Sequence, residues 1–387
     1  GIRDVHLTSG DERNRLIPRD SVFLDVGATS AAGVAALGIA PGDPVVPDSG
    51  FEVMNGTQNY VGKAWDDRVG CAVLIEAAKR GVMLAGGLPM TFPTISIHES
   101  FAHPTSMFLR NLMAMDTEEM LRAQPMDSVV LIGGCDKTVP AQLMGAASAD
   151  MPAIQLVVGP MLPMPYQGER LGACTDCRRF WGKFRAGEIT REAIDEVEGK
   201  LAATAGTCAV MGTASTMASI AEAIGMSLPG TAAIPAVHSD RLRAAEASGR
   251  RAVELAFTPI RPSEIITERS VENALRVLLS IGGSTNALIH LTAIAGRLGI
   301  KVSLERLNTL SDETPVLVDL KPTGEHYMSD LHAAGGLGAV LRELRPLLNL
   351  DCMTVTGKTI QQGGSRRGAL MIMLDDDHPD VARGQLC

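Results

Sequence analysis

Hydrophobic and polar positions alternate in a regular order through the middle of the chain. Short apolar runs at residues 94–97, 128–132 and 153–158 predict buried strands. Strands that alternate with helices are typical of α/β layers, so we expect an α/β fold with a mainly parallel sheet and helices on both faces. Apolar positions with helical spacing predict the helices at 106–115, 140–149, 191–203, 213–224, 271–279 and 286–298.

The most informative segment is VVLIGGCDKTVPAQLMGAA, in which the strand at 128–132 ends in two glycines followed by Cys135, Asp136 and Lys137. Ligands of open parallel sheets bind at the carboxyl ends of strands, where this tripeptide lies. Sulfur is a soft ligand that suits iron, and a carboxylate is a hard ligand that suits Mg²⁺. The alternative interpretation is a structural cysteine followed by a solvated ion pair.

Composition and charge narrow the classes of function. The 387 residues are 45% hydrophobic but only 3% aromatic, and the net charge is −9. Such a chain argues against nucleic-acid and anionic-membrane partners, because both need basic patches. No apolar run reaches the length of a membrane span, and no signal peptide opens the chain. Seven cysteines in this context favour reduced thiols and a cytoplasmic location.

The residues around the tripeptide resemble a known enzyme family. From about residue 85 to residue 359, blocks such as GGCDKTVPAQ, GTCAVMGTASTM and IGGSTNALIHL resemble the dihydroxy-acid and phosphogluconate dehydratases, especially the arabinonate-type sugar-acid branch. The resemblance implies a hydro-lyase that converts a sugar acid or a 2,3-dihydroxy acid into a 2-keto acid. It also implies a homo-oligomer with a small-molecule substrate, in carbohydrate metabolism or amino-acid biosynthesis.

The same resemblance implies two cofactors. Cys135 and Cys208 match ligands of an iron–sulfur cluster, either 2Fe–2S or 4Fe–4S. Glu99, Asp136 and Lys137 match a Mg²⁺ site in which the lysine is carbamylated in some members. A low-dielectric environment would favour the neutral amine that carbamylation needs, whereas a salt bridge between Lys137 and Asp136 is the metal-free alternative.

Substrate contacts are expected from Ser284 and Thr285, at the start of a predicted helix, and from His98. The alternatives are helix capping for the hydroxyls and a solvated loop for the histidine. The catalytic residue is unassigned, because the family's serine base belongs to a second domain. One cluster cysteine of the family also lies in a segment that a different sequence replaces, and Cys71 there is expected in the core. We therefore expect weak or no turnover.

The N-terminal segment follows a different pattern. VFLDVGA, GDPVVPDSGFEV and KAWDDRVGCAVLIEAAKR resemble the dinuclear-metal aminopeptidases that include glutamyl aminopeptidase, in which Asp66 would bridge two metals. The alternative is a carboxylate at a helix start. A metal-dependent aminopeptidase and a non-catalytic scaffold are the alternative functions. We expect an aminopeptidase-like segment at 1–83, a dehydratase-like iron–sulfur and magnesium domain at 84–359, and an unassigned tail at 360–387.

Overall fold

The chain divides into two compact units, Gly1–Lys63 and Ala64–Cys387. In the first unit, the described elements are α2 (Ala31–Ala36) and the antiparallel pair of β1 (Glu52–Val53) and β2 (Tyr60–Val61). The computed structural model describes residues 26–28, 30–40, 52–53, 60–61, 65–97, 99, 102, 104–173, 175–202 and 204–362.

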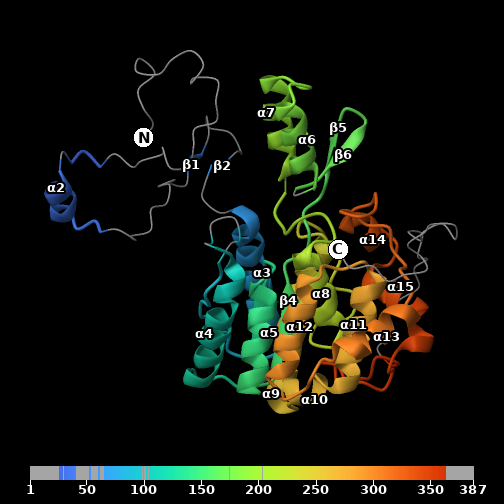
Figure 1. Ribbon diagram of the computed structural model, residues 1–387. Helices are drawn as coiled ribbons and strands as arrows, with labels where there is room; N and C mark the ends of the chain where they lie inside the picture. The colour runs from blue at the N-terminus through green and yellow to red at the C-terminus, as the bar shows by residue number, and fades with distance from the viewer. Residues whose placement is uncertain are drawn as a thin grey trace. The chain divides into compact units, whose positions relative to one another are not determined.

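The second unit combines many helices with a small parallel sheet, which confirms the α/β class (Figure 1). Five of the six predicted helices are present with ends that differ by up to three residues, whereas the helix predicted at 106–115 is a 3-10 turn at 106–109 followed by an α-helix that continues to Ala123. No helix among the described residues has both the length and the apolar character to cross a membrane. The helices are α3 (Trp65–Leu84), α4 (Arg110–Ala123), α5 (Thr138–Ala149), α6 (Thr175–Arg185), α7 (Arg191–Leu201), α8 (Thr213–Ala223), α9 (Ser239–Phe257), α10 (Pro262–Ile265), α11 (Glu268–Ser280), α12 (Asn286–Gly296), α13 (Leu304–Glu313), α14 (Met328–Ala333) and α15 (Gly336–Glu343), with 3-10 turns η5 (Ser106–Leu109) and η6 (Arg345–Leu347).

The parallel pair lies between two groups of helices. Strand β3 (Val129–Gly133) pairs in parallel with β4 (Ala153–Val157). Val129 and Leu131 join the main core, to which α4, α5, α8 and α11 also contribute. Ile132, at an alternate position of the strand, packs in a second cluster with residues of α3 and α9. A separate small cluster joins α6 and α7 to the hairpin of β5 (Met164–Tyr166) and β6 (Glu169–Leu171).

The predicted strand at residues 94–97 is wrong, because this segment is irregular. The amide of Ile95 donates to Asp116 Oδ2 at 2.7 Å, and Ser96 Oγ lies 2.6 Å from Thr138 Oγ1. The Asp116 side chain of α4 thus satisfies a backbone amide that a neighbouring strand would satisfy in a sheet. Ile97 packs on the main core, whereas Ile95 is 39% exposed, so the strand-like pattern here does not mark a strand.

Two buried charged side chains hold the loop that follows α8. Arg241, which is 0% exposed, donates to the carbonyls of Val157 and Thr231 at 2.8 Å and also to that of Ile234. Glu222 accepts the amides of Gly230 and Ala232 at 2.7 Å. Burial raises the pKa of Glu222, although these amides and Arg241 oppose the shift. The loop between α8 and α9 is therefore held to α8 by Glu222, and to α9 and the end of β4 by Arg241.

Helix α3 packs closely along α9, because glycines lie where the two backbones approach. A Cβ added at Gly249 would overlap the carbonyl oxygen of Ala78, and one at Gly81 would overlap that of Glu246. Cys71, on the same helix, packs against the cluster that includes Leu74 and Leu156. The contact between α3 and α9 leaves no room for a side chain at either glycine.

This packing makes a prediction about Gly249. Helix propensity alone would make Gly249→Ala stabilising, but the overlap with Ala78 outweighs it, and overpacking costs about 1–3 kcal/mol. We expect Gly249→Ala to lower the free energy of unfolding by that amount, measured by urea denaturation. The matched control is Gly199→Ala on the exposed face of α7, where a Cβ meets nothing within 4 Å. This control should raise stability by about 0.5–1 kcal/mol. Equal effects of the two substitutions would contradict the close approach.

Candidate functional site

The tripeptide lies at the carboxyl end of β3, as its position in the sequence indicates. Gly133 ends the strand, and Lys137 is the N-cap residue of α5. The Gln142 side chain donates to the Ile132 carbonyl at 2.9 Å. A Cβ added at Gly133 would lie only 2.5 Å from Gln142 Oε1. A side chain at residue 133 would therefore require Gln142 to shift. Cys135 and Asp136 therefore occupy a short connection between a buried strand and a buried helix.

Glu99, Asp136 and Lys137 come together in one ionic cluster. Lys137 Nζ lies 2.6 Å from Asp136 Oδ2 and 3.0 Å from Glu99 Oε2. The lysine is buried, whereas the Glu99 side chain is partly exposed. Cys135 Sγ donates to Asp136 Oδ1 at 3.3 Å. The geometry places two carboxylates, an amine and a thiol next to one another at the end of β3.

Glu99 accepts several hydrogen bonds from the start of η5. Thr105 Oγ1 donates to Glu99 Oε1 at 2.7 Å, and the amide and hydroxyl of Ser106 both donate to Oε2. Partial burial raises the pKa of Glu99, but the hydrogen bonds from Ser106, Thr105 and Lys137 outweigh it and lower the pKa to about 2. Glu99 is therefore an anion at any physiological pH.

Lys137 is charged in this arrangement, which differs from the neutral amine favoured by the argument from low dielectric. Burial lowers the pKa of Lys137, but the hydrogen bonds and charges of Asp136 and Glu99 reverse this and raise it above its usual value. The structure therefore has the salt bridge given as the metal-free alternative. Carbamylation needs the neutral amine, so this ion pair opposes it.

Cys208 lies beyond the end of the neighbouring strand. The amide of Thr207 donates to the Gly159 carbonyl at 2.9 Å, and the Met161 amide donates to the Thr207 carbonyl at 2.8 Å. This segment thus extends the sheet edge past β4. Gly206 has φ 131°, and a Cβ there would lie 2.6 Å from Met161 N, so the turn before Cys208 requires glycine. Cys135 and Cys208 both lie in segments just beyond the carboxyl ends of the parallel strands. Cys71 lies on α3 and packs in the cluster of Leu74 and Leu156.

Two of the three predicted substrate residues, Ser284 and Thr285, lie at the start of α12. Ser284 Oγ lies 2.7 Å from Thr213 Oγ1, and the Ser284 amide donates to Thr216 Oγ1 at 3.1 Å. Thr285 is the N-cap residue of α12 but makes no side-chain capping bond. Ser284 therefore connects the start of α12 to the start of α8. His98 lies outside the described residues.

Other motifs of the sequence have structural surroundings or lie outside the description. Asp176, in the CTDC stretch, is buried and accepts the Gly172 amide at 2.9 Å and the Tyr327 hydroxyl at 2.7 Å. Lys321 Nζ lies 3.3 Å from the same carboxylate. This network fits a structural element. Cys174, the side chain of Asp66 and residues 363–387 are outside the described part of the chain.

The sequence did not identify His290 as part of this region. His290, on α12, is fully buried, and Arg110 donates to its Nδ1 at 2.8 Å. The proton of the neutral ring therefore lies on Nε2, which has no hydrogen-bond partner among the described residues. Burial and the positive charges of Arg110 and Lys137 lower the pKa of His290 to about 3, with Asp136 opposing. A histidine in an otherwise apolar helical stretch was the available signal.

Comparison with known proteins gives two family matches. The family described as dihydroxy-acid/6-phosphogluconate dehydratase, N-terminal, matches residues 61–363. The family described as M42 glutamyl aminopeptidase matches residues 1–101. Both resemblances inferred from the sequence motifs are therefore confirmed.

Similar curated proteins are dehydratases. An L-arabinonate dehydratase of Rhizobium leguminosarum bv. trifolii is 47% identical over 302 residues, which cover 76% of this chain and 52% of the relative. A 6-deoxy-6-sulfo-D-gluconate dehydratase of Pseudomonas putida is 45% identical over 284 residues, covering 73% and 49%. A dihydroxy-acid dehydratase of Caldanaerobacter subterraneus subsp. tengcongensis is 42% identical over 294 residues, covering 74% and 53%. The chain spans about half the length of these relatives.

The buried histidine makes a prediction about pH. The pKa of His290 is below the usual histidine value of about 6.5, so the unfolded chain binds this proton first and stability falls as the pH drops below that value. We expect His290→Gln, whose amide oxygen can still accept from Arg110, to lose about 2 kcal/mol less stability than the parent between about pH 7.5 and about pH 5. Urea denaturation at both pH values measures this difference. Parallel losses in the two proteins would show that His290 does not titrate on unfolding.

Proposed function

The chain belongs to the dihydroxy-acid/6-phosphogluconate dehydratase family, and from this premise we propose that it carries the cofactor-binding half of a hydro-lyase site. The proposed reaction removes a proton from C2 and hydroxide from C3 of a sugar acid or 2,3-dihydroxy acid. The resulting enol becomes a 2-keto acid. The observation that carries the proposal is the convergence of Glu99, Asp136 and Lys137 beside Cys135 at the carboxyl end of β3.

The donor atoms suit the two proposed cofactors. The oxygens of Glu99 and Asp136 are hard ligands appropriate to Mg²⁺, and Lys137 would add an oxygen ligand if carbamylated. The thiols of Cys135 and Cys208 are appropriate ligands for an iron–sulfur cluster. When bound, the two groups supply Lewis-acid stabilisation for the departing hydroxide and for the charge that develops beside the substrate carboxylate.

The protein's own groups have distinct proposed tasks. Hydrogen bonds hold Glu99 as an anion, so a cation that displaces the Lys137 ammonium meets this charged ligand without a protonation cost. Ser284 and Thr285, at the start of α12, are the proposed contacts for substrate oxygens, together with His98. Arg110, which is partly exposed, donates to the buried His290 and fixes the orientation of its ring.

The proposal extends to the surroundings of the site. The pair of β3 and β4 would be the centre of a larger, mainly parallel sheet with helices on both faces. A cytoplasmic location would keep the thiols reduced for cluster assembly. The activity, the substrate and the partners of the longer relatives are inferred for this chain from the family, because it covers about half of their length.

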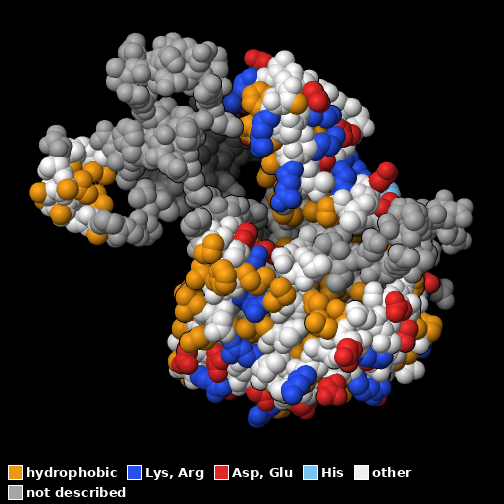
Figure 2. Space-filling view, viewed as in Figure 1, with side chains coloured by type: hydrophobic (Ala, Val, Ile, Leu, Met, Phe, Trp, Pro, Cys, Tyr) orange, Lys and Arg blue, Asp and Glu red, His pale blue; other side chains and the backbone are white. Residues whose placement is uncertain are grey.

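We also propose that the chain forms a homo-oligomer through α4. Apolar side chains gather over α4 and its neighbours (Figure 2). Phe108, Leu112 and Met115 follow one another at helical spacing and are 74%, 49% and 50% exposed. Such a contiguous apolar stripe is unusual on a monomer surface, and a second copy of the chain would bury it.

The cluster proposal predicts a spectroscopic loss. After anaerobic reconstitution with iron and sulfide, we expect visible absorption that Cys135→Ser and Cys208→Ser each reduce strongly. Any 2-keto acid formation from sugar acids should fall at least about 100-fold in Cys135→Ser, because a Lewis acid contributes several kcal/mol. Cys352→Ser is the control, since Cys352 is buried beside Asn273. Unchanged absorption in Cys135→Ser would refute the ligand assignment, whatever the turnover.

The oligomer proposal makes a separate prediction. We expect Leu112→Glu to shift the chain toward the monomer in light scattering coupled to size-exclusion chromatography, because it places a charge in the apolar stripe. Phe257→Glu is the control, since Phe257 is 84% exposed at the end of α9, away from α4. A monomeric parent chain, or equal shifts in both variants, would contradict the proposed interface.

A further inference from the structure

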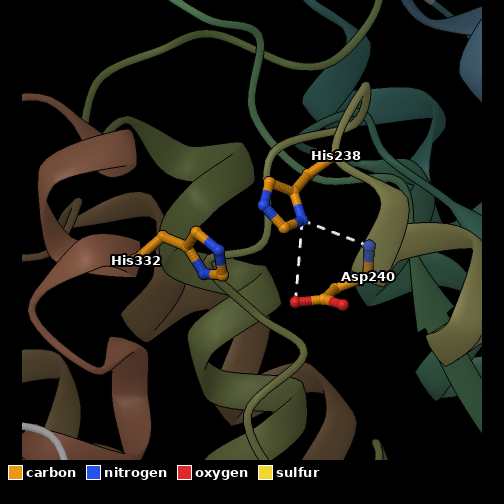
Figure 3. A group of neighbouring side chains, drawn as sticks. All are labelled: His238, Asp240 and His332. Atoms are coloured by element: carbon orange, nitrogen blue, oxygen red, sulfur yellow. Dashed lines mark hydrogen bonds and ion pairs between the residues drawn. The ribbon is translucent and has the colours of Figure 1, made fainter.

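Two imidazoles and a carboxylate meet at the start of α9 and the end of α14. His238 is the N-cap residue of α9, Asp240 lies in its first turn, and His332 lies in the last turn of α14. One ligand atom from each residue lies within 4.8 Å of the others. Figure 3 shows the three side chains directed toward one another from the two helices. None of them belongs to the cysteine and carboxylate site described above.

We propose that His238, Asp240 and His332 form a binding site for a divalent transition-metal ion of the zinc type, which joins α9 to α14. Zinc is bound by imidazole nitrogen and carboxylate oxygen at about 2.0–2.2 Å, which separates tetrahedral donors by roughly 3.4 Å. His238 Nδ1 already lies 3.6 Å from Asp240 Oδ2. Small side-chain rotations bring in His332, whose ring centroid lies 5.1 Å from that of His238.

The surroundings prepare these side chains for a metal. Arg243 forms an ion pair with Asp240 Oδ1, which leaves Oδ2 toward His238. Partial burial and the charges of His238 and Arg241 lower the pKa of His332, with Asp240 opposing, and this direction favours the neutral imidazole. The site is partly open, so water can occupy a fourth position.

The donor set also indicates which metals are excluded. Mg²⁺ and Ca²⁺ prefer oxygen ligands, and a site with two imidazoles and one carboxylate supplies too few. Arg243 further offsets the single negative charge of Asp240. Borderline ions such as Zn²⁺, Co²⁺ and Ni²⁺ gain most from imidazole. The two imidazole ligands therefore favour Zn²⁺, Co²⁺ and Ni²⁺ over Mg²⁺ and Ca²⁺ at this site.

The helix cap of α9 decides how the site must be tested. His238 Nδ1 accepts the Asp240 amide at 3.1 Å, so a metal at this nitrogen competes with the cap. Replacement by alanine would remove both functions together. Asparagine is a favoured N-cap residue, so His238→Asn keeps the capping bond and removes only the imidazole. His332→Gln removes the second imidazole from the other helix.

The experiment is a Zn²⁺ titration of the EDTA-treated full chain by calorimetry. Because thiols also bind zinc, the readout is the difference between variants. We expect His238→Asn and His332→Gln each to lose one equivalent of binding, or to weaken it by more than the roughly 10–100-fold that loss of an outer-shell group costs. His326→Gln, a nearby histidine paired with Asp319 and Asp330, is the matched control and should bind as the parent does.

Two further readouts separate metal binding from simple loss of structure. Zn²⁺ should raise the unfolding temperature of the parent and of His326→Gln more than that of the two site variants. Co²⁺ should give a visible absorption band that the site variants lack. Circular dichroism without metal should be the same in all four proteins. Zinc binding of equal stoichiometry and equal affinity in the parent and both site variants would overturn the proposal, as would Mg²⁺ binding as tight as that of Zn²⁺.

Discussion

The desolvated guanidinium of Arg241 constrains much of the second unit. A charged group taken out of water is costly unless hydrogen bonds replace its hydration. Arg241 meets this requirement with the carbonyls of Val157, Thr231 and Ile234, and so ties the end of β4 to the loop after α8. Gly159 lies against both the Ile234 carbonyl and this guanidinium, and a Cβ there would overlap both. Because Gly159 pairs with Thr207, the position of Cys208 depends on the same arginine.

A second constraint is the balance of charge at the end of β3. Two carboxylates and one ammonium lie within 3.0 Å, so the cluster carries a net negative charge that a divalent cation could compensate better than lysine does. The proposed Mg²⁺ would compete with the Lys137 ammonium for the same oxygens.

Helix α3 lies where the two family likenesses overlap, at residues 61–101. Nearly all of this helix falls in the aminopeptidase-like segment, which the sequence predicts to end at residue 83. Its packing places it with the body, because Gly81 and Gly249 allow α3 and α9 to approach closely over the β3–β4 pair. The compact units accordingly divide between Lys63 and Ala64.

The sequence by itself determined the α/β class, the six helices predicted from their spacing, the strands β3 and β4, and the family. These depend on local periodicity and on motifs such as the Cys135 tripeptide, whose residues are adjacent in the chain. Tertiary structure decided the rest. Residues 94–97 have a strand-like pattern but no ladder partner, because side chains of other elements satisfy their polar groups.

The charge of Lys137 was decided by Glu99 as well as by Asp136, and the neutral state of His290 by burial beside Arg110. The cluster of His238, Asp240 and His332 joins two helices distant in sequence. Desolvation and the meeting of distant side chains depend on how the elements pack, and a local pattern of residues does not contain that information.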